Sequence, residues 1–213
     1  QHPLKPIVNK IIENRELIVL NSHAHWDHVL GNHQFEKIYI HKSETQFINK
    51  KYNLSFLQDS PLESIKKYRK YDFYIPPAKN IIGIADGFTF NLGGTNIKVI
   101  HMPGHSPGSV CLLKDQQAIF TTDVAYYGDI FLPSRDLFTP VLESLENLMN
   151  MCKNYDDIIL YPSHSKTPCD INLVKHLYKE INKIDEKWGN KKSRSFFNAW
   201  EIKSDHFNFI IGK

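Results

Sequence analysis

The hexapeptide His23-Ala24-His25-Trp26-Asp27-His28 decides how this chain is interpreted. It holds three imidazoles and one carboxylate within six residues, and Zn(II) or Fe(II) accept both kinds of ligand. The apolar run Leu17-Ile18-Val19-Leu20 before it is typical of a short strand. The cluster is therefore expected where a strand ends and a loop begins, a place where functional residues concentrate. A histidine-rich surface loop is the alternative, and three histidines spaced around one aspartate argue against it.

Three later segments each end an apolar, strand-like run on a candidate ligand. Residues 97–102 run into Pro103-Gly104-His105-Ser106-Pro107-Gly108-Ser109, where two prolines and two glycines predict a tight turn around His105. Residues 118–122 end at Asp123, and residues 158–161 lead through Pro162 and Ser163 to His164. Because four strand-like runs all end on ligand types, we expect one rim that collects them.

This order of motifs resembles the metallo-β-lactamase-fold hydrolases. The matching pattern is His23-x-His25-x-Asp27-His28, then Gly104-His105-Ser106-Pro107-Gly108-Ser109, then Asp123, then Ser163-His164. It covers roughly residues 17 to 165 of the chain, and the four motifs together are specific for the superfamily rather than for a substrate. The resemblance implies an α/β protein with the αββα sandwich of that fold.

The resemblance also implies two metal sites that share one carboxylate. In this division His23, His25 and His105 hold the first ion, Asp27, His28 and His164 hold the second, and Asp123 bridges them. Two ions about 3.5–4 Å apart can share a hydroxide and clamp a substrate oxygen, and bound water can reach a pKa of about 7. We therefore expect two zinc ions per chain, with iron or manganese as alternatives, and no serine or cysteine nucleophile.

Two positions narrow the branch of the superfamily. In the true β-lactamases of this fold the position of Asp123 looks like cysteine or serine, whereas an aspartate is similar to glyoxalase II, N-acyl-homoserine lactonases, acyl thioesterases and nucleases. The pair His23-x-His25 also differs from the His-x-Glu of the flavodiiron proteins. The resemblance thus implies a binuclear hydrolase that uses a bridging hydroxide on an ester-like bond, first a thioester or a lactone.

Asp27 and Tyr126 are the residues we expect to act in catalysis beside the metal ligands. A tyrosine three residues after Asp123 resembles the lactonases and some acyl-thioester hydrolases of the fold. Its phenol would donate a hydrogen bond to the substrate carbonyl or to the developing oxyanion. The alternative is an ordinary packed tyrosine, since Tyr127 follows directly.

Three other functions compete with this interpretation. A mononuclear iron persulfide dioxygenase shares the pattern His-x-His-x-Asp-His, and a phosphodiesterase of the same fold would act on a phosphate ester. The sequence contains no added nucleic-acid domain, which counts against RNA cleavage. A binding module without activity is disfavoured, because all seven ligand types are retained.

Length and composition bound the remaining possibilities. The chain has 213 residues, of which 41% are hydrophobic, so one domain over residues 1–213 with a sizeable core is the expectation. Its 26 basic and 23 acidic residues give a net charge of +3, which is no nucleic-acid signature. No apolar run approaches the roughly 20 residues of a membrane span. We therefore expect a small-molecule substrate, no nucleic-acid or membrane partner, and a cytoplasmic protein, while a homodimer stays open.

The beginning of the chain departs from the family pattern. Only 22 residues precede His23, whereas the family places several strands before that histidine. We therefore expect the fold to lack its usual N-terminal strands, in a chain that is shortened or completed by another chain. The first residue is Gln1 rather than methionine, so secretion also stays open.

Periodicity and turn residues predict the remaining elements. We expect helices over residues 6–14, 42–52, 61–71, 140–152 and 170–187. We expect strands over residues 37–40, 95–101, 109–113, 117–121, 196–202 and 207–211. Within residues 86–95 we expect two strands joined by a Gly93-Gly94 turn.

Overall fold

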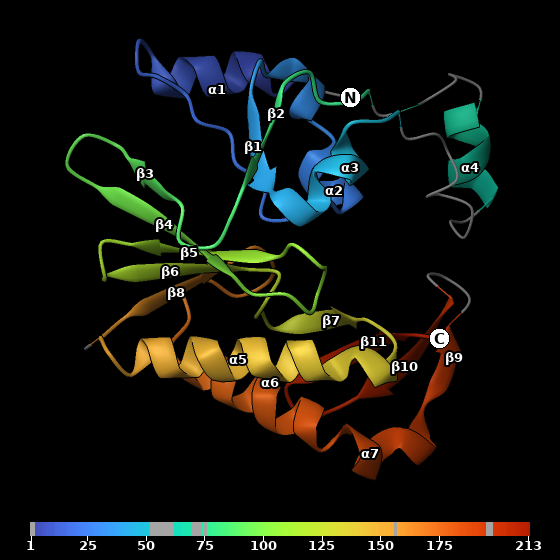
Figure 1. Cartoon of the computed structure of the whole chain (residues 1–213). Helices are drawn as coiled ribbons and strands as arrows, with labels where there is room; N and C mark the ends of the chain where they lie inside the picture. The colour runs from blue at the N-terminus through green and yellow to red at the C-terminus, as the bar shows by residue number, and fades with distance from the viewer. Residues whose placement is uncertain (1–2, 52–61, 70–73, 75, 156, 195–197) are drawn as a thin grey trace. The chain divides into compact units, whose positions relative to one another are not determined.

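The computed structural model describes residues 3–51, 62–69, 74, 76–155, 157–194 and 198–213. The chain divides into two compact units, Gln1–Ile84 and Ala85–Lys213, and each has its own hydrophobic core. Both units combine helices with strands (Figure 1), so the α/β class expected from the sequence is confirmed. No helix in the described part of the chain has the length and the apolar character needed to cross a membrane.

The first unit is built around a pair of parallel strands. Its elements are α1 (Lys5–Ile12), α2 (Trp26–Val29), η1 (Asn32–Gln34), β1 (Ile38–His41), η2 (Lys42–Glu44), α3 (Thr45–Ile48), α4 (Leu62–Arg69) and β2 (Ile81–Ile84). β1 and β2 pair in parallel with Ile38 opposite Ile81. Ile38 and Ile40 lie one strand period apart, so both point into the same core and are fully buried. This core also contains Val29 from α2, which anchors the hexapeptide segment to the unit.

The chain segment before the hexapeptide is less regular than the sequence suggests. Leu20 forms an isolated bridge with Tyr39, and only two backbone hydrogen bonds, from Tyr39 to Val19 and from Asn21 to Tyr39, join this segment to β1. The strand expected over residues 17–20 is therefore wrong in extent, since only residues near its end lie against β1. The chain leaves this pairing at Asn21, two residues before His23.

The second unit contains two sheets. Five strands follow the order β3-β4-β5-β6-β8, and four follow the order β7-β11-β10-β9. The strands of the first sheet are β3 (Thr89–Asn91), β4 (Asn96–His101), β5 (Val110–Lys114), β6 (Ala118–Thr122) and β8 (Ile159–Pro162). Those of the second are β7 (Gly128–Leu132), β9 (Lys192–Arg194), β10 (Ala199–Lys203) and β11 (Phe207–Gly212). β6 pairs in parallel with β8, and β7 with β11, while the other pairs are antiparallel.

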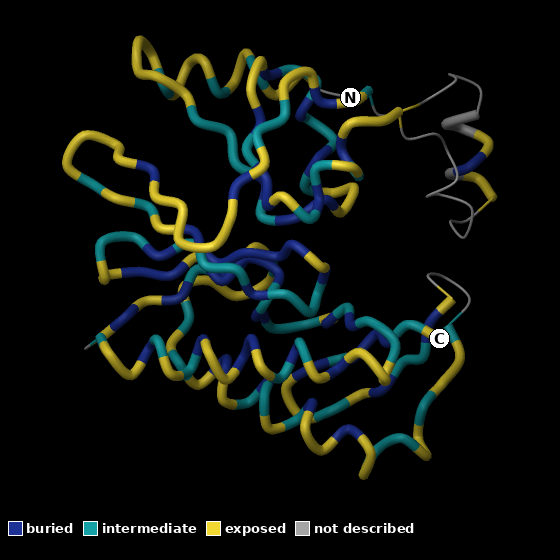
Figure 2. The backbone as a smooth tube through the Cα atoms, viewed as in Figure 1, coloured by how far each residue is buried: buried dark blue, intermediate teal, exposed yellow. Residues whose placement is uncertain are grey.

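Two helices cover the core of the second unit. α5 (Phe138–Cys152) and α6 (Asn172–Asn182) lie side by side (Figure 1), and α7 (Ile184–Lys187) with η5 (Trp188–Asn190) follows them. Buried positions recur along both helices with helical spacing (Figure 2), as an amphipathic helix on a core requires. Leu145, Leu148 and Leu177 from the helices share one core with Ile119 and Phe209 from the two sheets.

Most of the expected elements are confirmed. The helix expected over residues 42–52 is instead the 3-10 turn η2 followed by the short helix α3, which ends at Ile48. The helix predicted over residues 170–187 ends at Asn182, and a separate turn of helix begins at Ile184. Strands β2, β7 and β9 were not predicted. Residues 52, 61, 70, 71, 196 and 197 of the expected elements lie outside the described residues.

The turn around His105 depends on a glycine. Gly104 has a φ of +144°, a backbone conformation that L side chains rarely adopt. A Cβ at this position would lie 2.7 Å from the Cα of Val141 in α5. The side chain of Ser144, one turn further along the helix, donates a hydrogen bond of 2.6 Å to the carbonyl of Pro103. The loop is thus seated directly on α5, and only glycine allows the close approach.

Replacing Gly104 by alanine should destabilise this unit strongly. We expect Gly104→Ala to lower the free energy of unfolding by about 3 kcal/mol, because backbone strain and overpacking each cost about 1–3 kcal/mol. Urea denaturation measures this loss. Gly87→Ala is the matched control, because Gly87 has a φ of +78° but nothing within 4 Å of the added Cβ. Its loss should be about 1 kcal/mol, and equal losses for the two variants would contradict the close-packing argument.

Candidate metal centre

The first set of ligands begins where the segment that pairs with β1 ends. His23 is fully buried just after the chain separates from β1. His25 is in extended conformation as the N-cap of α2, and Asp27 and His28 lie within that helix. The short helix turns the chain so that residues spaced along six positions face one another rather than alternating outward.

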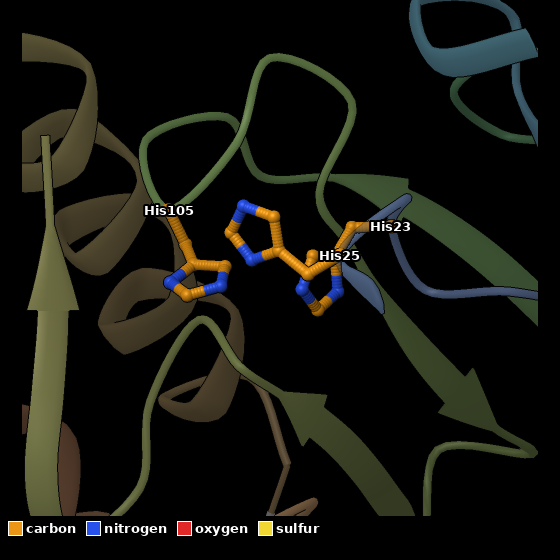
Figure 3. Close-up of side chains that lie close together, drawn as sticks. All are labelled: His23, His25 and His105. Carbon is orange, nitrogen blue, oxygen red and sulfur yellow. The ribbon is translucent and has the colours of Figure 1, made fainter. Parts of the chain in front are cut away.

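The imidazoles of this first set lie close together. The ring centroids of His23 and His25 are 4.5 Å apart and the rings are nearly perpendicular. Figure 3 shows the two side chains. Those of His23 and His28 are 4.2 Å apart. One ligand nitrogen of His23 lies within 4.8 Å of one on His25 and of one on His28. Asp27 completes the set, with its Oδ2 3.5 Å from Nε2 of His28.

Neighbouring polar side chains fix this segment. The hydroxyl of Ser22 lies 3.1 Å from Nδ1 of His23. The amide of Asn21 donates to the carbonyl of His28 over 3.1 Å, and Asn32 in turn donates to the side-chain oxygen of Asn21 over 2.8 Å. Such outer contacts orient ligand groups and hold the backbone that carries them.

The second set of ligands belongs to the second unit and follows from its parallel strand pair. Asp123 comes directly after β6, and His164 follows β8 by two residues. Because β6 and β8 are parallel neighbours, both residues lie at the same edge of the sheet. Nε2 of His164 lies 3.2 Å from Oδ2 of Asp123, and Nε2 of His105 lies 3.7 Å from the same oxygen. Two imidazoles thus approach one buried carboxylate oxygen.

The orientation of His105 is set by the main chain of β7. Nδ1 of His105 lies 3.0 Å from the carbonyl oxygen of Phe131. A carbonyl only accepts hydrogen bonds, so Nδ1 carries the proton and donates it. Nε2 is then the nitrogen with an available lone pair, and it is the one that faces Asp123. This tautomer lets a histidine bind a metal through Nε2.

Tyr126 lies beside these residues and is almost fully buried. Its ring packs edge-on against His164 with the centroids 5.3 Å apart. Its hydroxyl oxygen accepts a hydrogen bond from the backbone N–H of Phe131 over 3.3 Å. A phenol oxygen that accepts a hydrogen bond still has its own proton to donate.

None of the cysteines offers a thiolate at neutral pH. Burial raises the pKa of Cys152 to about 11 and the pKa of Cys111 still further. Burial also raises the pKa of Cys169, although Lys166 opposes the shift. Because the thiolate is the nucleophilic form, the raised pKa values keep these three side chains in the less reactive thiol form.

Each unit therefore brings together its own share of the predicted residues. The first unit gathers His23, His25, Asp27 and His28, and the second gathers His105, Asp123, His164 and Tyr126. Sequence reasoning missed the supporting groups around them. The carbonyl of Phe131 carries no side-chain signal, and asparagines at positions 21 and 32 are ordinary loop residues until the fold pairs them.

The donor set fits divalent transition ions. Imidazole nitrogens with carboxylate oxygens suit zinc, iron and manganese, and both sets include a histidine whose ring is held by a neighbour. The buried carboxylate of Asp123 among imidazoles is a costly arrangement in the absence of positive charge. A cation beside it would offset that cost.

Known proteins share both the sequence pattern and the fold. The family model described as the metallo-beta-lactamase superfamily matches residues 14–164. A solved structure of a beta-lactamase domain protein from Burkholderia ambifaria aligns with a TM-score of 0.64 at 16% identity, covering 89% of this chain and 62% of that one. The structure of TTHA1623 in a di-iron-bound form aligns with a TM-score of 0.55 at 21% identity, covering 81% and 82%. At these identities the likeness concerns the fold alone.

Two kinds of curated relative are similar in sequence. The acyl-coenzyme A thioesterase MBLAC2 of Bos taurus is 33% identical over 122 residues, which is 54% of this chain and 44% of the relative. A hydroxyacylglutathione hydrolase of Francisella tularensis subsp. novicida is 27% identical over 150 residues, which is 68% of this chain and 48% of the relative. The chain thus spans about half the length of these relatives. With the match over most of its length, the chain belongs to the metallo-β-lactamase superfamily.

Proposed function

We propose that this chain is a binuclear metal-dependent hydrolase whose two ligand sets form one site. In the proposed site His23, His25 and His105 hold one ion, Asp27, His28 and His164 hold the other, and Asp123 is shared between them. The observation that carries the proposal is the buried Oδ2 of Asp123, which two imidazoles approach to within 3.2 and 3.7 Å. A carboxylate in that position suits the role of a bridge between two cations.

Neither unit alone supplies the three protein ligands that each of the two proposed ions would take. A zinc ion is usually four-coordinate, and a catalytic zinc takes three protein ligands and keeps one position for water or substrate. In the proposed division each unit supplies only part of such a shell for each ion, for example His23 and His25 without His105. The candidate ligands occur in the order that the superfamily shares, and membership of that superfamily supports joining the two sets.

The residues of the chain would prepare the site for hydrolysis. When bound, a pair of divalent ions supplies a nucleophile at neutral pH and Lewis acidity for a carbonyl oxygen. Phe131 holds His105 with its Nε2 directed to the site, and Ser22 contacts the ring of His23. Asp27, whose Oδ2 lies 3.5 Å from Nε2 of His28, is the proposed acceptor of a proton from the attacking water, and Tyr126 is the proposed donor to the carbonyl oxygen.

A thioester is the substrate class that we favour. One curated relative is named an acyl-coenzyme A thioesterase and another a hydroxyacylglutathione hydrolase. Trp26 is 41% exposed between two proposed ligands, so it offers an apolar surface to an acyl group beside the site. A lactone is the second candidate of the same ester-like chemistry. An iron persulfide dioxygenase, which would need one iron per chain, and a phosphodiesterase are the remaining alternatives.

Metal content and hydrolysis measured together test this proposal. We expect two zinc, iron or manganese ions per chain, and turnover of acyl-coenzyme A or S-lactoylglutathione above that of a homoserine lactone, a cephalosporin and bis-p-nitrophenyl phosphate. Asp123→Asn should lower the affinity for the metal by at least about 100-fold, because it weakens a proposed ligand of both ions and outer contacts alone account for 10–100-fold. Inductively coupled plasma mass spectrometry and chelator competition give the two values.

Asp129→Asn is the control for the loss of one carboxylate. Asp129 lies on β7 in the same unit, and its partners are Asn208 and Arg194 rather than a proposed ligand. The metal affinity of the Asp129→Asn variant should equal that of the wild type. A single iron per chain with oxygen-dependent turnover of a persulfide would overturn the binuclear hydrolase, and hydrolysis of the phosphodiester alone would overturn the substrate class.

Tyr126→Phe tests the proposed role of the phenol. If the hydroxyl donates to the developing oxyanion, kcat should fall about 100-fold with little change in KM, because the bond strengthens in the transition state. Metal content should not change. Tyr127→Phe is the matched control, since Tyr127 stacks on Phe207 with centroids 5.5 Å apart and burial raises the pKa of its phenol. Equal kcat values for Tyr126→Phe and the wild type would assign Tyr126 a packing role.

A further inference from the structure

Glu44 is a buried carboxylate close to the first ligand set. It ends η2, directly after β1, and only 1% of its surface is exposed. A buried carboxylate is costly unless hydrogen bonds or charges compensate it. Its Oε2 accepts a hydrogen bond from the backbone N–H of Ala24. The sequence motif does not include this residue, which lies 20 positions further along the chain.

Ala24 is the residue between two proposed ligands. Its peptide links His23, which is fully buried, to His25, which is exposed. Both imidazoles nevertheless meet at 4.5 Å, so the backbone between them must hold one particular conformation. The amide of Asn21 holds the far end of the segment through the carbonyl of His28. The bond from Ala24 to Glu44 holds its middle.

Few residues separate β1 from Glu44, the acceptor of the hydrogen bond from Ala24. β1 carries Ile38 and Ile40 into the core and ends at His41, and η2 brings Glu44 back to the loop. The acceptor is therefore fixed by the packing of the unit rather than by a flexible side chain on the surface. A group held in this way can restrain the loop before any ion binds, which lowers the entropy lost on binding.

We propose that Glu44 is a positioning residue that fixes the spacing of His23 and His25 by holding the Ala24 N–H, an inference that rests on the metal site proposed above. Its role is that of a hydrogen-bond acceptor at a fixed reach. Side chains that support a ligand indirectly typically contribute 10–100-fold to metal affinity. An amide oxygen at the same reach would serve, whereas a shorter carboxylate would not.

Two conservative variants separate the length of the Glu44 side chain from its charge. Glu44→Gln keeps the reach and removes the charge, so its zinc affinity should stay within about threefold of the wild type. Glu44→Asp keeps the charge and withdraws the acceptor, so its affinity should fall about 10-fold or more. Competition with a chromophoric chelator gives the affinities, and the visible spectrum of the Co(II) form reports the coordination geometry. Hydrogen exchange of the Ala24 amide should be faster in Glu44→Asp than in the wild type.

Ile48→Ala is the control for a general loss of stability. Ile48 is buried in the same core but lies on α3, and it should destabilise the unit without changing zinc affinity beyond about threefold. Equal affinity losses in Ile48→Ala and Glu44→Asp would overturn the positioning role, as would wild-type affinity in Glu44→Asp. A wild-type chain that binds no zinc, iron or manganese would instead overturn the proposed function itself.

Discussion

Parallel pairing of β6 with β8 is the constraint on which the second ligand set depends. Parallel strands run in the same direction, so the residues that follow them meet at one edge. Asp123 and His164 are 41 positions apart in sequence (164 minus 123), yet their side chains approach to 3.2 Å. The core beneath this edge includes Ile119 of β6 and Leu160 of β8, both fully buried, so the position of the edge is set by packing.

Both ligand sets use the same physical device to orient their imidazoles. In each, a group that is itself fixed by the core holds the segment that carries the histidines. β7 presents a main-chain carbonyl to His105, and η2 presents the carboxylate of Glu44 to the backbone N–H of Ala24. Neither contact depends on the metal. The structure therefore describes a preorganised arrangement, in which the cost of ordering the ligands is met largely by folding.

The sequence predicted what short-range patterns encode and missed what depends on distant pairing. Residue type and spacing indicated the motifs at His23–His28 and around His105. The apolar face of the helix that ends at Cys152 predicted that helix. Strands β2 and β7 were not predicted, because each is a short run that contains a glycine. Each forms a strand by pairing with a segment far along the chain. The break near Lys183 interrupts a stretch that periodicity alone reads as one helix.

The supporting residues were missed for a related reason. A glutamate at position 44 has no signal in the sequence until β1 folds it back against Ala24. What the fold adds is the placement of each set within its own unit, the first after the segment that bridges to β1 and the second after β6 and β8.

Phe131 contacts two residues of the candidate site through its backbone N–H and its backbone carbonyl. Its carbonyl accepts from His105, and its N–H donates to Tyr126. Any amino acid other than proline provides the same pair of groups. The alignment of the imidazole therefore sets no requirement on the amino acid at this position except that it is not proline.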